Sequence, residues 1–154
     1  MIERVVSDDQ WAVADGLIRE YVEALGFDLC FQDVDRELAE LPTEYGPPGG
    51  AAFLAGEGAG FVGVHRLDDH VAELKRMYVV PAARGAGVGR ALAVAAVEEA
   101  RRLGYRRLRL DTLSSMEAAV RLYLDLGFTD IPPYRDNPIP EARYLELVLS
   151  VLED

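Results

Sequence analysis

A glycine-rich segment, residues 80–90, has the composition and position expected of an anion-binding loop. Its three glycines let a ligand approach the backbone closely, and two arginines flank them. Apolar spacing after the segment predicts a helix over residues 87–103. The unpaired N–H groups and the positive dipole end of a helix N-terminus favour phosphate. The predicted phosphate loop consists of Arg84, Gly85, Ala86, Gly87, Val88, Gly89 and Arg90.

The spacing in this loop excludes two common nucleotide-binding motifs. The dinucleotide fingerprint requires a third glycine at position 90, where the chain has Arg90. The P-loop requires Gly-Lys followed by serine or threonine, and the sequence has no such triplet. A tight turn that binds no ligand is the alternative interpretation.

The charge distribution also points to a small anionic ligand. The chain of 154 residues has a net charge of −11, yet residues 74–109 hold nine basic and two acidic side chains. Such a balance argues against a general nucleic-acid binder and fits an anion held by one basic segment. A solvated helix face beside a basic strand would explain the same charges without a ligand.

Several features place the chain among cytoplasmic proteins without a metal. Its longest apolar run, residues 91–97, is far shorter than the roughly 20 residues that span a bilayer. The first residues lack the apolar stretch of a secretory signal. With a single cysteine, Cys30, the chain has no intramolecular disulfide and no multi-cysteine metal site.

The hydrophobic pattern predicts the elements that position the loop. Strands are expected over residues 2–6, 51–55, 60–66, 71–80, 106–113, 128–131 and 144–149. Helices are expected from a Ser7 cap to a Gly26 stop, and over residues 33–41, 87–103 and 114–126. The order β-α-α-β-β-β-α-β-α-β-β predicts one α/β (α+β) domain, residues 1–154, with a mixed, largely antiparallel sheet of about seven strands and four helices on its faces.

The loop and its neighbours resemble one protein family. Arg84-x-x-Gly87-x-Gly89 resembles the Arg/Gln-x-x-Gly-x-Gly/Ala motif of the GNAT (GCN5-related) N-acetyltransferase superfamily, which holds the pyrophosphate of acetyl-coenzyme A (acetyl-CoA). Residues 75–81 resemble the strand before that loop, and residues 119–128 resemble the A-x-x-L-Y-x-x-x-G-F segment. The resemblance implies a GNAT-like fold and an acetyl-CoA-dependent N-acetyltransferase, with acetyl-CoA as cosubstrate. A non-catalytic acetyl-CoA sensor or an interaction module is the alternative.

Direct attack of a primary amine on a thioester benefits from a base for the amine and an acid for the departing thiolate. Tyr123 matches the tyrosine of the LY segment, which implies that it is the acid, although it also lies on an apolar helix stripe. Glu73 lies eleven residues before Arg84, the spacing of the base glutamate in histone acetyltransferases of the superfamily. A water chain, or pairing of Glu73 with Lys75 or solvent, is the alternative.

The resemblance also implies contacts along the cosubstrate. The backbone of Met77, Tyr78 and Val79 is expected to bond its pantetheine arm, and an N–H near Val79 is expected to hold the oxyanion. Where the family often has asparagine, seven residues before the tyrosine, this chain has Met116. Ser114 or Ser115 is the expected substitute.

The acceptor remains open between several amines. The regions that form the acceptor side in the superfamily are acidic here, which favours a cationic amine; these residues are Asp28, Asp33, Asp35, Glu37, Asp136 and Glu141. Arg135 is suited to clamp a carboxylate, so an amino acid or short peptide would use both charges. The expected partner is a small-molecule or peptide amine, with no nucleic acid and no membrane; a homodimer is left open.

Overall fold

A mixed sheet forms the centre of the computed structural model, which describes residues 1–26 and 33–149. Its strand order is β1-β2-β3-β4-β5-β7-β6, and β4 and β5 pair in parallel while the other neighbours are antiparallel. The strands are β1 (Ile2–Arg4), β2 (Ala51–Ala55), β3 (Gly60–Arg66), β4 (Val71–Val79), β5 (Arg107–Leu113), β6 (Thr129–Asp130) and β7 (Ala142–Val148). The predicted fold class is confirmed.

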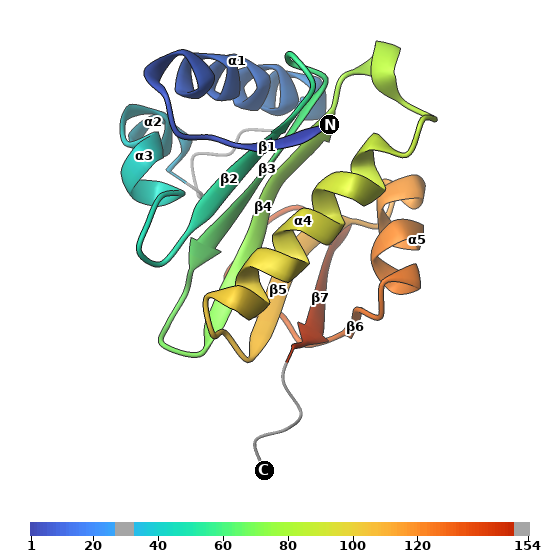
Figure 1. Cartoon of the computed structure of the whole chain (residues 1–154). Helices are drawn as coiled ribbons and strands as arrows, with labels where there is room; N and C mark the ends of the chain where they lie inside the picture. The colour runs from blue at the N-terminus through green and yellow to red at the C-terminus, as the bar shows by residue number, and fades with distance from the viewer. Residues whose placement is uncertain (27–32, 150–154) are drawn as a thin grey trace.

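Helices cover both faces of this sheet (Figure 1). They are α1 (Asp8–Leu25), α2 (Val34–Ala39), α3 (Leu41–Glu44), α4 (Val88–Arg102) and α5 (Glu117–Asp125), with a 3-10 turn over Pro81–Ala83. The expected single helix over residues 33–41 is wrong: Pro42 does not end it but lies in the first turn of α3. Proline is tolerated there because the first N–H groups of a helix have no intrahelical acceptor.

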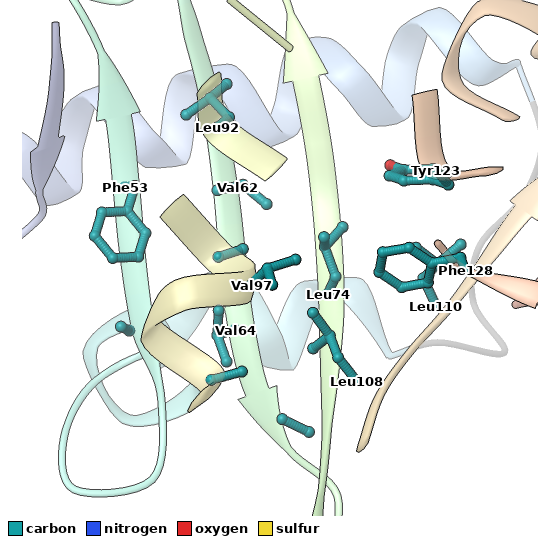
Figure 2. Close-up of a cluster of buried hydrophobic side chains, with 14 of the residues drawn as sticks. Phe53, Val62, Val64, Leu74, Leu92, Val97, Leu108, Leu110, Tyr123 and Phe128 are labelled. Carbon is teal, nitrogen blue, oxygen red and sulfur yellow. The ribbon is translucent and has the colours of Figure 1, made fainter. Parts of the chain in front are cut away.

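Two apolar clusters pack the helices onto the sheet. The larger one lies under α4 and α5 and includes Leu92, Leu74, Leu110, Tyr123 and Phe128 (Figure 2). The second lies under α1 and α3, on the opposite face. Strands β2, β3 and β4 present side chains to both clusters, so this part of the sheet is buried on both sides.

The two ends of α1 agree with the sequence prediction, whereas the start of α5 does not. The Ser7 side chain and Gln10 form a capping box at the start of α1, and Gly26 ends the helix with a φ of 72°, as expected. Helix α5 instead begins after Met116, with no side-chain cap. The expected serine cap is therefore wrong, and the Ser115 hydroxyl instead donates to Glu141, 2.8 Å away.

Strand β4 contains a bulge that changes which side chains share a face. Phe61 pairs with Tyr78, and Gly63 pairs with Lys75, so one residue of β3 lies opposite two residues of β4. Arg76 lies in this bulge with a φ of 59°. Strict alternation along residues 73–78 is therefore interrupted at Arg76. Beyond the bulge, Met77 joins the cluster under α4, while Tyr78 packs on the α1 side.

The parallel pair β4–β5 is short. Its register runs only from Val71 opposite Arg107 to Glu73 opposite Arg109, whereas β5 stays paired with β7 along its whole length. Beyond Glu73, no described residue of β4 pairs with β5. The last part of β4 therefore presents an edge that has no strand partner on the β5 side.

Candidate functional site

The glycine loop forms a nest of free backbone donors at the start of α4. Gly85 and Gly87 have φ values of 89° and 82°, and Gly87 is the N-cap of the helix. Among the described residues, none accepts a hydrogen bond from the N–H groups of residues 85–90. A Cβ on either glycine would meet no atom within 4 Å, so the space above the loop is open. The loop therefore has the free N–H donors and the open space that binding of an anion such as phosphate requires.

A large cavity of about 560 Å³ extends from this nest along β4 to α5. Its walls are the loop, the end of β4, the start of α5 and three positions on α1. Eight of the predicted cosubstrate residues line it: Met77, Tyr78, Val79, Arg84, Gly85, Gly87, Val88 and Gly89. Met116 also lines it, whereas Ala86, Arg90 and Ser115 are not among its described lining residues.

The two loop arginines have different surroundings. The Arg84 Nε donates to the carbonyl of Val79 over 2.8 Å, and its guanidinium lies 5.7 Å from the centre of the Tyr78 ring. Arg90 pairs with Asp125 on α5 at 3.3 Å, with both side chains exposed. Arg84 is thus held at the wall of the large cavity, and Arg90 lies outside it.

Tyr123 lies where a second, smaller cavity of about 70 Å³ adjoins the first. Its ring is buried beside Phe128, with centroids 5.6 Å apart (Figure 2). Burial raises the pKa of its hydroxyl, so the group keeps its proton at neutral pH. The two cavities share the residues Tyr21, Leu25, Met77, Met116 and Ala119. Tyr123 therefore both packs in the core and reaches a cavity.

Glu73 is fully buried between β3 and β5 and is engaged by the loop before β7. Its Oε2 accepts a hydrogen bond from the Tyr134 hydroxyl at 2.7 Å and lies 2.6 Å from Arg135 Nη2. Its Oε1 receives no hydrogen bond from the described residues. Glu73 is not among the described residues that line either cavity. The structure does not bring it to Tyr123 at the cavity wall.

Polar residues that the sequence did not single out line the smaller cavity. Asp111 and Lys75 lie on the strands that separate, β5 and β4, and Asn137 lies in the loop before β7. One signal was present for Asp111: it follows Arg107 and Arg109 in the alternating strand, at a position where the pattern gives arginine. Lys75 carried no such signal, because the hydrophobic pattern of the sequence does not reveal the bulge in β4 beside it.

Two of the acidic residues expected on the acceptor side, Glu37 and Asp33, are engaged by arginines. Glu37 is buried and takes two hydrogen bonds from Arg76, at 2.7 and 3.0 Å. Burial alone would raise the pKa of Glu37, but Arg76 outweighs it and holds that pKa below its ordinary value. Asp33 pairs with Arg36. Asp28 and Cys30 lie outside the described residues.

Three of the basic residues at the end of α4 and in β5, namely Arg102, Arg107 and Arg109, pair with protein carboxylates. Arg107 and Arg109 both pair with Glu146, at 2.9 and 2.8 Å. Arg102 donates to Glu99 on its own helix. The basic segment is therefore an ion-paired surface in this part of the chain, and the anion-binding character lies in the loop.

Two kinds of feature are absent from residues 1–26 and 33–149. No helix there is long and apolar enough to cross a membrane. No group of three or more His, Cys, Asp or Glu side chains there is arranged to hold a metal ion.

Solved structures share the arrangement of helices and strands. An acetyltransferase of Streptococcus agalactiae superposes with a TM-score of 0.77 at 24% identity, covering 97% of this chain and 98% of its own. An acetyltransferase of Salmonella typhimurium, described with its cofactor acetyl-CoA, superposes with a TM-score of 0.66 at 21% identity, covering 98% and 94%. These similarities show the fold.

Sequence comparison extends the similarity to the family. A Schizosaccharomyces pombe protein, named an uncharacterized N-acetyltransferase, is 41% identical over 139 residues, covering 87% of this chain and 85% of its own. The model of the acetyltransferase (GNAT) family matches residues 14–128, which include the loop, the free edge of β4 and Tyr123. The chain therefore belongs to the acetyltransferase (GNAT) family.

Proposed function

We propose that this protein is an acetyl-CoA-dependent N-acetyltransferase that acts on the primary amine of a small molecule, an amino acid or a peptide in a ternary complex. The observation that carries the proposal is the continuity of one cavity, from free loop N–H groups past the unpaired edge of β4 to Met77, where it meets the cavity of Tyr123. The Salmonella typhimurium structure described with acetyl-CoA supports the same ligand here.

The residues present fit the parts of this cosubstrate. The N–H groups of residues 85–90 and the dipole of α4 are suited to the pyrophosphate. The edge of β4 around Met77, Tyr78 and Val79 is suited to the amide-containing pantetheine arm, since it lacks a strand partner toward β5. A contact from Ser115 is not supported, because its hydroxyl is engaged by Glu141. The bound thioester supplies an activated acetyl group.

The protein's part in the reaction is to position an amine and move protons. The amine loses a proton and forms a C–N bond to the acetyl carbon while the C–S bond breaks. Tyr123 donates its proton to the departing sulfur, and an N–H near Val79 stabilises the charge on the carbonyl oxygen. The nitrogen loses two protons in all: one is released, and the other replaces the proton that Tyr123 gave to the sulfur. An ammonium ion and a thioester thereby give an amide, a thiol and one released proton.

For Glu73 the contacts favour positioning over direct proton abstraction. It holds Tyr134 and Arg135, and through Arg135 it is linked to Asp111, which does line the smaller cavity. Its free Oε1 is able to accept a proton, so its role as the base stays a prediction. That role requires a water path from the cavity.

A thermal-shift titration tests cosubstrate binding. Acetyl-CoA at about 100 times its Kd should stabilise the fold by about 2.7 kcal/mol, a melting shift of several degrees. No shift at millimolar acetyl-CoA would refute the assignment. Thiol release with a panel of amines then separates an enzyme from a sensor, which would bind without turnover.

A further inference from the structure

We propose, resting on the function above, that the smaller cavity selects an acceptor with a free carboxylate next to its amine, a small amino acid. The structure assigns the carboxylate to Lys75 and the ammonium group to Asp111. These two side chains face one cavity from the two strands, β4 and β5, that separate beyond Glu73.

Lys75 is a largely buried cation, and among the described residues its nearest carboxylate, that of Glu37, is already engaged. Its Nζ lies 3.9 Å from Glu37 Oε1, beyond hydrogen-bond distance, and its side chain is 11% exposed. Glu37 accepts hydrogen bonds from Arg76 and from the Tyr45 hydroxyl. A buried ammonium group without a close partner is costly. A ligand carboxylate in the cavity would supply that partner.

Asp111 has one engaged oxygen and one free oxygen. Its Oδ2 lies 3.0 Å from Arg135 Nη1 and 3.5 Å from Asn137 Nδ2. Its Oδ1 receives no hydrogen bond from the described residues. The carboxylate is thus held in place by the loop before β7 and keeps an acceptor atom for an ammonium group.

Arg135, the carboxylate clamp expected from the sequence, is not free for that role. It contacts Glu73 Oε2 at 2.6 Å and Asp111 Oδ2 at 3.0 Å, so two protein carboxylates already neutralise it. Its contribution is to fix Asp111. The position left for a ligand carboxylate is therefore Lys75.

The charge balance around the cavity favours a zwitterion over a polyamine. Three cations stand against three carboxylates in the linked set Lys75, Arg76, Arg135, Glu37, Glu73 and Asp111. A zwitterionic amino acid adds no net charge to this buried set, whereas a polyamine adds an unpaired cation. The small volume, about 70 Å³, favours a short side chain.

The test uses acceptors matched in shape, each amino acid against its own carboxamide. Wild-type protein should acetylate a small amino acid with a kcat/KM about 10–150-fold above that of the amide, the range of a hydrogen bond to a charged group. Lys75→Gln should remove this preference by raising KM for the acid and leaving the amide unchanged. Lys75→Arg keeps the charge and should retain part of it.

Binding supplies a second readout. Calorimetric titration of CoA-loaded protein with the amino acid should show affinity that Lys75→Gln weakens by the same factor, with acetyl-CoA binding unchanged. Arg107→Gln, which loses a surface ion pair to Glu146, is the matched control and should change neither value.

Two failures are distinguishable. Equal turnover of acids and amides by the wild type, with acetyl-CoA still bound, would overturn the carboxylate assignment and leave the acetyltransferase proposal standing. Absence of acetyl-CoA binding would overturn both. The wild-type comparison decides even if a Lys75 variant does not fold.

Discussion

Tyr123→Phe separates the two roles that the structure gives to this residue. The ring is 4% exposed and packs on Phe128, and phenylalanine keeps that packing. The hydroxyl receives and donates no hydrogen bond within the described residues, so its removal leaves no partner unsatisfied. We therefore expect the free energy of unfolding to change by less than about 0.5 kcal/mol.

The expected effect on turnover is much larger. Burial raises the pKa of the Tyr123 hydroxyl, so that the residue is a protonated phenol, able to donate its proton, throughout the neutral range. Loss of one general acid lowers the rate of the chemical step by roughly 10²–10⁴. That corresponds to about 2.7–5.4 kcal/mol of transition-state stabilisation, while acetyl-CoA affinity should be unchanged.

Single-turnover thiol release is the appropriate assay, because slow product release would hide a change in the chemical step. Phe128→Leu is the control, since it alters the same packing and leaves the hydroxyl. A Tyr123→Phe protein that keeps more than about a third of the wild-type single-turnover rate would remove Tyr123 from the mechanism. The cosubstrate assignment, which depends on the loop, would be unaffected.

Three further predictions concern the loop and the stability of the fold. Gly87→Asp should abolish the acetyl-CoA melting shift, because its charge repels phosphate. Its Cβ meets no atom within 4 Å, so the cost to folding is confined to the left-handed backbone at this position. Wild-type affinity in calorimetry would contradict this prediction. Hydrogen bonds from Arg102 and Arg4 lower the pKa of Glu99 to about 2. The stability that these bonds give the folded state should therefore be lost as the pH falls from about 4.5 toward 2. In urea unfolding, the free energy of unfolding of Glu99→Gln should depend less on pH over this range than that of the wild type. Gly63→Ala places a Cβ 2.7 Å from the buried Tyr45 ring and should destabilise by about 1–3 kcal/mol in urea unfolding, whereas Gly16→Ala, with no atom within 4 Å, should not.

The loop and the element order were predictable because their causes are local. A helix start with a left-handed N-cap favours glycine, and the sequence alone shows Gly87 at that position. Hydrophobic periodicity gave the strands and the main helices, since each strand and helix face must meet an apolar cluster. The same local signals carry the family motif, so the resemblance to the family was visible in residues 84–89 and 119–128.

The arrangement around the acceptor cavity depended on contacts between distant segments. The bulge at Arg76 exists in the pairing of β4 with β3, and it brings Lys75 and Arg76 to Glu37, about 40 positions earlier in the chain. Arg135 is occupied because Glu73 and Asp111 lie on adjacent strands beneath it. Spacing along a chain determines which face a side chain takes within one element, but it carries no information about which charge from another element will meet it. Only the tertiary structure could therefore place Lys75 and Asp111 in one cavity.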